Sequence, residues 1–226
     1  MELEQFAATR AQKQGGAAWQ LESPRCLEVN LNSESVRIKV GAMIAYRGDL
    51  KFERTSSGGM GKMMKAMFTS ESGRSTNVTG TGVLYLADLA KEITILQLTD
   101  DVLFVNSSDL LAYSSDLEWD ITTIKGAGMV AGGLFTFKLW GNGFVALTTH
   151  GNPLVLPVTP EEPLFTDPDA TVAWSEKLQV GVKTDVSVKT MTGRASGETW
   201  QMQFSGTGFV VVQPFEETAR NAGAQG

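Results

Sequence analysis

The chain has 226 residues, 42% of them hydrophobic, and a formal net charge of −6. It therefore has material for a sizeable core, and its acidic balance argues against a phosphate-binding surface, so nucleic acid is not an expected partner. Cys26 is the single cysteine, which excludes an internal disulfide and indicates an intracellular protein. No run approaches the roughly 18 apolar residues of a membrane helix. Residues 1–20 lack the apolar segment of a signal peptide. We expect a soluble, cytoplasmic protein.

The first strand pattern begins after residue 26. Leu27, Val29 and Leu31 alternate with polar residues, as in a half-buried strand. A turn is expected at residues 32–33, followed by a second strand over residues 36–40. Residues 1–25 show no such pattern and are expected to form an N-terminal extension.

An eleven-residue segment then occurs three times, at residues 42–52, 109–119 and 170–180. The middle of each copy is polar, which predicts a tight turn or bulge between two short strands. The opposite face carries a small residue in each copy, which suggests close approach of another sheet or unit: Ala45, Ala112 and Ala173. Apolar residues at every second position share one strand face: Ile44, Tyr46, Leu50 and Phe52; Leu111, Tyr113, Leu117 and Trp119; Val172, Trp174, Leu178 and Val180.

A Gly-x-Gly segment also occurs three times, at residues 80–82, 141–143 and 206–208. Strand-like residues precede each copy and an apolar run follows it. Glycine accepts the positive φ of a two-residue hairpin turn. Each copy is therefore predicted to be the turn of a β-hairpin.

The spacing of these copies predicts a triplicated domain. The alanines lie 67 and 61 residues apart, and the first glycines lie 61 and 65 residues apart. A unit of about 60 residues cannot bury both faces of its sheets alone. We expect an all-β fold of short antiparallel strands, repeated three times around a pseudo-threefold axis within one domain at residues 26–214. The expected units and tail are residues 27–97, 98–160 and 161–214, and a flexible segment at 215–226.

One short helix is predicted near residues 60–68. Its apolar residues recur at i, i+3, i+4, i+7 and i+8, with Lys62 and Lys65 on the other side. A helix of this length is not stable alone in water. It either plugs the open end of a β unit or forms a docking face for a partner or a membrane surface. The candidate contact residues are Met60, Met63, Met64, Met67 and Phe68.

No catalytic or metal-binding set is recognisable in the sequence. His150 is the single histidine, so a multi-histidine metal site cannot be built, and no Gly-x-Ser-x-Gly motif accompanies it. The glycine-rich residues 57–62 fail the spacing of a phosphate-binding loop. The Gly-x-Gly-x-x-Ala motif at residues 126–131 precedes a strand pattern instead of a helix. We therefore expect no enzyme activity, no cofactor and no metal.

Several segments resemble one known family. They are Gly-Ala-Met-Ile-Ala-Tyr-Arg-Gly-Asp-Leu at residues 41–50, Asn-Ser-Ser-Asp-Leu-Leu-Ala-Tyr at 106–113 and Ser-Gly-Glu-Thr-Trp-Gln-Met-Gln-Phe-Ser-Gly-Thr-Gly-Phe at 196–209. Over about residues 36–214 the chain resembles the family of the yeast "altered inheritance of mitochondria" protein, a domain of unknown function. Residues 69–77 are more polar than that part of the family usually is.

The resemblance implies a β-sandwich or short double-stranded β-helix repeated three times, similar to the tryptophan-sensing RNA-binding attenuator protein. It also implies that the protein forms oligomers. The yeast relative is mitochondrial and linked to inner-membrane organisation, whereas this chain has no basic presequence and resembles a bacterial protein. The family implies no catalytic residue.

Four functions remain as hypotheses. The first is a non-enzymatic, oligomeric β scaffold or binding module that contacts copies of itself and a protein partner. The second is a membrane-associated organising protein that uses the methionine-rich helix. The third is an RNA-binding protein, by fold analogy alone. The fourth is an enzyme with a small-molecule site at an open end of the β structure.

Overall fold

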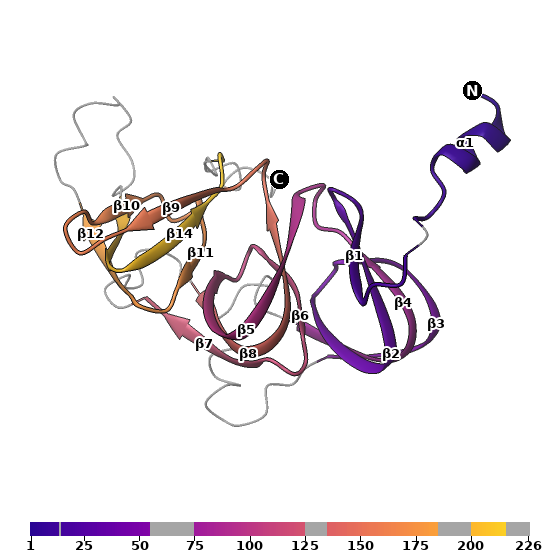
Figure 1. The fold of residues 1–226 in the computed structure, drawn as a ribbon, viewed down its shortest axis with the longest axis horizontal. Coiled ribbons are helices and arrows are strands. Elements are labelled where there is room, and N and C mark those ends of the chain that lie inside the picture. Colours follow the sequence, from indigo (N-terminus) through magenta and orange to yellow (C-terminus); the bar gives the residue numbers. More distant parts are fainter. Residues whose placement is uncertain (14, 55–74, 125–134, 185–199, 216–226) are drawn as a thin grey trace, which may run out of the picture.

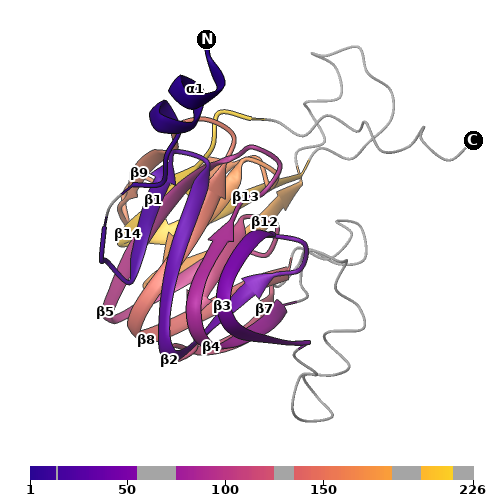
Figure 2. The same cartoon turned by 90° about the vertical axis from the view of Figure 1, so that its right-hand side faces the viewer.

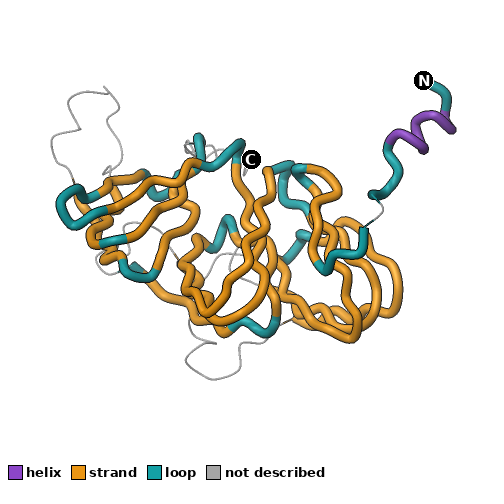
Figure 3. The backbone as a smooth tube through the Cα atoms, viewed as in Figure 1, coloured by secondary structure: helices purple, strands orange, loops and turns teal. Residues whose placement is uncertain are grey.

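The computed structural model describes residues 1–13, 15–54, 75–124, 135–184 and 200–215 (Figure 1). These residues form strands joined by loops, and the one helix among them, α1 (Leu3–Thr9), lies apart from the sheets (Figures 1 and 3). The all-β prediction is confirmed. The predicted helix at residues 60–68 and its five candidate contact residues lie outside the described residues, as does most of the predicted tail.

The strands fall into three consecutive parts along the chain. The first part contains β1 (Trp19–Ser23), β2 (Cys26–Lys39), β3 (Met43–Arg54) and β4 (Ser75–Leu86). The second part contains β5 (Glu92–Asn106), β6 (Leu110–Ser114), β7 (Glu118–Thr123) and β8 (Phe135–Thr149). The third part contains β9 (Leu154–Val158), β10 (Leu164–Thr166), β11 (Thr171–Ser175), β12 (Leu178–Thr184), β13 (Trp200–Gly206) and β14 (Gly208–Val212).

All strand pairs are antiparallel. The larger sheet has the order β3-β4-β2-β6-β8-β5-β11-β14-β9, with β1 also on β2 and β7 also on β8. The smaller sheet has the order β10-β13-β12. Figure 2 shows the long, curved strands, with β2 beside β4 and β5 beside β8. β1 lies within the predicted N-terminal extension and belongs to the larger sheet.

The three parts share one strand register. Each alanine of the eleven-residue segment pairs with the residue five positions after the first glycine of its Gly-x-Gly segment. The pairs are Ala45 with Tyr85, Ala112 with Ala146, and Ala173 with Val211. The related sequences therefore form related strand pairs, while the pseudo-threefold axis stays a prediction.

The predicted break inside the eleven-residue segment occurs in two of its three copies. A turn separates β6 from β7, with the amide of Leu117 donating to the carbonyl oxygen of Ser114 at 3.1 Å. A turn also separates β11 from β12. In the first copy, β3 continues without a break through Gly48, which has a φ of +94°.

The hairpin prediction for the Gly-x-Gly segments is wrong. Gly80 lies inside β4 and Gly141 inside β8, while Gly206 ends β13 and the next strand begins two residues later. Their φ values of +129°, +105° and +111° bend the chain without reversing it. Positive φ is required in both geometries, so glycine alone does not distinguish a hairpin turn from a bent strand.

The residue between the two glycines holds the bend of the neighbouring strand. In the first part, the amide of Ser33 donates to Thr81 Oγ1 at 3.1 Å. In the second part, the amide of Asp100 donates to Asn142 Oδ1 at 3.2 Å. Ser33 and Asp100 both have positive φ, so β2 and β5 bend where their partner strands bend. The turn expected at residues 32–33 is a bulge within β2.

The bent strands enclose three clusters of buried apolar side chains. The first cluster is built mainly from β2 and β4, the second from β5, β6 and β8, and the third from β11, β13 and β14. Representative members are Leu27, Val29 and Leu84; Val105, Leu139 and Val145; and Trp174, Met202 and Phe204.

Candidate functional site

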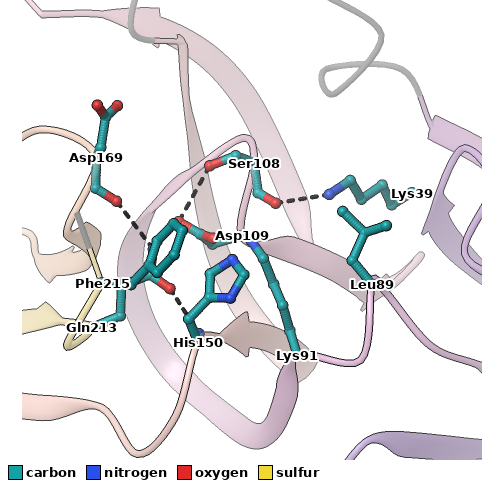
Figure 4. A pocket seen from close by; sticks show the side chains of 9 residues that line it. All are labelled: Lys39, Leu89, Lys91, Ser108, Asp109, His150, Asp169, Gln213 and Phe215. Carbon is teal, nitrogen blue, oxygen red and sulfur yellow. Dashed lines mark hydrogen bonds and ion pairs between the residues drawn. The ribbon is translucent and has the colours of Figure 1, made fainter. Parts of the chain in front are cut away.

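A cavity of about 180 Å³ lies where loops from the three parts meet (Figure 4). Leu89, His150 and Phe215 each lie nine positions after the first glycine of their part, and all three line the cavity. Lys39, Lys91, Ser108, Asp109, Asp169 and Gln213 complete the lining. Residues at related positions of the repeated pattern thus come together from distant places in the sequence.

The same backbone hydrogen bond positions each loop beside this cavity. The donor in every part is the amide of the residue seven positions after the first glycine of the Gly-x-Gly segment. The acceptor is the carbonyl oxygen of the residue three positions before the alanine of the eleven-residue segment. The three bonds run from Ala87 to Ala42 at 2.9 Å, from Thr148 to Asp109 at 2.8 Å and from Gln213 to Ala170 at 2.9 Å. The repeated register therefore sets the position of the cavity.

Two lysines connect the first and second parts at the cavity. Lys39 Nζ lies 2.8 Å from Asp88 Oδ2 and donates to the carbonyl oxygen of Ser108 at 2.8 Å. Lys91 Nζ lies 3.0 Å from Asp109 Oδ1, and both of these side chains are buried. Burial raises the pKa of Asp109, while the positive charge of Lys91 acts in the opposite direction.

His150 and Gln213 connect the second and third parts. The His150 amide donates to Gln213 Oε1 at 2.9 Å, and Gln213 Nε2 donates to the carbonyl oxygen of Asp169 at 3.0 Å. The ring of His150 stacks on Phe215 with centroids 3.9 Å apart. Figure 4 shows this stack beside the Lys91 and Asp109 side chains. His150 thus takes part in packing between loops.

Several polar groups at the cavity bond to one another. The Ser108 hydroxyl lies 3.1 Å from Asn106 Oδ1 and 3.2 Å from Asp109 Oδ2, an arrangement that hydrogen-bonds the hydroxyl without providing a histidine base. Among the described residues, no group of three His, Cys, Asp or Glu side chains is arranged to hold a metal ion. The arrangement fastens three loops together through ion pairs and hydrogen bonds.

A second candidate surface lies along strands at the ends of the sheets. β3 ends the larger sheet and exposes Met43, Ile44, Tyr46 and Phe52. The Tyr46 and Phe52 rings are 5.1 Å apart in an edge-on contact. β9, at the other end of the same sheet, exposes Leu154 and Val155, and β10 exposes Phe165 in the smaller sheet. The sequence pattern did not reveal this surface, because the same alternation is buried in the second and third parts.

The sequence matches one known family. A family model described as "Mitochondrial biogenesis AIM24" matches residues 19–215. The chain belongs to the AIM24 family. The matched residues start with β1 and end just after β14, so the AIM24 region contains every strand of both sheets. The predicted family resemblance is confirmed, whereas similarity to the RNA-binding attenuator protein stays a prediction.

A solved structure has a similar fold. The crystal structure of a Streptococcus pyogenes protein has a TM-score of 0.69 and 20% identity to this chain, covering 88% of this chain and 92% of the other. Because the identity is low, this likeness concerns the fold alone. None of the curated proteins matches the AIM24 chain described here. Within its described residues, no helix is long and apolar enough to cross a membrane.

Proposed function

We propose that this AIM24 protein is a non-enzymatic β scaffold that works as a homo-oligomer. The observation that supports this proposal is the exposed apolar surface on the end strand β3, at Ile44 and Tyr46. An unpaired strand edge presents free N–H and C=O groups, and apolar side chains beside it favour pairing with another chain. Burying an Ile side chain contributes about 1.5–3 kcal/mol, so a small number of such residues stabilises a contact.

The cavity supports the same proposal, because its charged groups are used to hold the parts together. Lys91 and Asp109 neutralise each other, and Lys39 binds both a carboxylate and a backbone carbonyl. Such a junction holds the loops at this cavity together. A rigid body with apolar strands at its ends is suited to building assemblies.

Analytical ultracentrifugation of the full chain over a wide concentration range tests the proposal. We expect a species of two or more chains, that is, a multiple of the 24.3 kDa chain mass. Dissociation on dilution would give an association constant. A constant mass of one chain at all concentrations would contradict the scaffold proposal.

Two alternatives from the sequence remain proposals with their own tests. A membrane-associated organiser would use residues 60–68, which lie outside the described residues. If the protein has this function, flotation with anionic liposomes would place it in the lipid fraction. RNA binding is opposed by the net charge of −6; filter binding at low salt would detect it, and genuine binding would weaken as salt rises.

A further inference from the structure

Two junctions inside the chain use the same strand pairing. Where the first part meets the second, β2 pairs with β6 through Val36–Ser114, Arg37–Tyr113 and Ile38–Ala112. Where the second part meets the third, β5 pairs with β11 through Leu103–Ser175, Phe104–Trp174 and Val105–Ala173. In both junctions the Ala-aromatic-polar triplet of the eleven-residue segment pairs with three consecutive residues of the preceding part.

The two halves of a third such junction are also present. Each part has three consecutive residues that pair with the positions two, three and four before the first glycine of its own Gly-x-Gly segment. They are residues 36–38 in the first part, 103–105 in the second and 164–166 in the third. β10 is therefore the third-part counterpart of the junction strands in β2 and β5. The corresponding triplet of the first part is Ala45-Tyr46-Arg47 in β3. Among the described residues, β3 pairs only with β4, and β10 pairs only with β13.

Within the part of the chain that the structure describes, the triplet in β3 is less covered than its counterparts. Tyr46 is 49% exposed, whereas Tyr113 is 2% exposed and Trp174 is 3% exposed. Ala45 is exposed, but Ala112 and Ala173 are buried. On the other half, Phe165 is 40% exposed. Both unpaired strands thus expose an aromatic residue at the position that is central in the internal junctions.

We infer that β3 of one copy pairs with β10 of a second copy, in the register Ala45–Thr166, Tyr46–Phe165 and Arg47–Leu164. This inference rests on the proposed homo-oligomeric function and names its contact. The two strands lie toward opposite ends of the molecule (Figure 1), so a second copy supplies the partner. The contact repeats the register of the β2–β6 and β5–β11 junctions.

The chemistry of the two strands suits this pairing. Tyr46 and Phe165 meet as a directly opposed aromatic pair, the counterpart of Phe104 and Trp174, whose rings stack 5.8 Å apart. Neither strand contains a proline that would remove an edge N–H group. Because β3 and β10 are different surfaces, each copy uses both, and the contacts build a ring or a chain of copies.

Two single variants and their mixture test the contact. Tyr46→Lys removes the β3 side, and Phe165→Lys removes the β10 side, so each variant alone is expected to sediment as one chain. A Tyr46→Lys copy still has an intact β10, and a Phe165→Lys copy still has an intact β3. An equimolar mixture should therefore form a dimer and stop there. The matched control is Phe209→Lys on β14, an apolar position that is 39% exposed and lies outside the contact, which should keep the wild-type mass.

The outcomes separate this contact from the general proposal. A wild-type protein that is always one chain would reject both. A wild-type oligomer whose mass is unchanged in Tyr46→Lys and in Phe165→Lys, or changes only in Phe209→Lys, would reject the contact and keep the homo-oligomer.

A cross-link provides a measurement for variants that fold poorly. The Tyr46→Cys/Phe165→Cys protein, in a Cys26→Ser background, is expected to give disulfide-linked multimers on a non-reducing gel. A disulfide within one chain would instead show that β3 and β10 pair inside the same copy, and would overturn the inference.

Discussion

Phe104 of β5 stacks on Trp174 of β11, with ring centroids 5.8 Å apart and ring planes 2° apart. Trp174 also contacts Phe204 edge-on, with ring centroids 5.5 Å apart. Trp174 therefore joins the second part of the chain to the cluster of buried residues in the third. Its counterpart in the first part, Tyr46, contacts the ring of Phe52 on the same strand and is 49% exposed.

Replacing Trp174 should strongly destabilise the protein. Trp174→Ala removes a buried aromatic side chain, and we expect the free energy of unfolding to fall by about 3–5 kcal/mol. Urea denaturation followed by circular dichroism measures this change. Tyr46→Ala, made in the Phe165→Lys background to exclude contacts between copies, is the control and should change stability by less than about 0.5 kcal/mol. Equal losses at the two positions would contradict the assigned difference in burial.

The buried ion pair should respond unequally to single and double replacement. Asp109→Ala leaves the Lys91 ammonium group buried without its carboxylate, at an expected loss of about 3–5 kcal/mol. Lys91→Met/Asp109→Leu removes both charges and should recover most of that loss. Thermal and urea denaturation measure both.

The exposed pair formed by Lys138 and Glu176, 3.8 Å apart, is the control for the buried pair. Glu176→Gln should change stability by no more than about 1 kcal/mol. If the double variant at positions 91 and 109 were as unstable as Asp109→Ala, the buried charges would not be the cause of the loss.

Glu28 should make stability depend on acid pH. Burial alone would raise the pKa of Glu28, but hydrogen bonds from Asn30 at 2.9 Å, Gln12 at 2.6 Å and Gln20 at 2.7 Å outweigh it and lower that pKa. A lowered pKa in the folded state gives stability that is present above the unfolded value of about 4.3. That stability is lost as pH falls through the folded pKa.

Glu28→Gln tests this pH dependence. The free energy difference between wild type and variant should be constant near neutral pH and should shrink below about pH 4. Urea denaturation at a series of pH values between about 3 and 7 measures it. A difference that grows on acidification would have the opposite sign and would refute the assignment.

The bend glycines should differ in their tolerance of alanine. A Cβ at Gly80 would lie 2.1 Å from the Asp49 carbonyl oxygen, whereas a Cβ at Gly141 would have its nearest neighbour, Leu117 Cδ2, at 4.0 Å. Both positions have positive φ, so each alanine costs about 1–3 kcal/mol in backbone strain. Gly80→Ala should cost clearly more, because β3 must also move away. Equal melting temperatures for Gly80→Ala and Gly141→Ala would show that the close backbone approach is unimportant.

The amino-acid sequence by itself determined where most strands lie and that three parts share one pattern. Alternation at positions such as Leu111 and Tyr113 defines a strand face whatever the surroundings, since successive side chains point to opposite sides. The Gly-x-Gly segments were predicted to be hairpin turns. Their first glycines do have positive φ, but the direction of the chain beyond them depends on the neighbouring strand. The Ser33–Thr81 contact supplies that information and joins residues far apart in sequence.

Only the tertiary structure decided which copies of the pattern are covered and which loops meet. Tyr46, Tyr113 and Trp174 occupy the same place in the repeated segment, yet the first is exposed and the others are buried. Tyr113 and Trp174 lie where β6 pairs with β2 and β11 pairs with β5, whereas among the described residues β3 pairs only with β4. The cavity beside Lys91 and Asp109 likewise exists only after three distant loops converge. Local side-chain order determines strands, whereas long-range packing determines their neighbours.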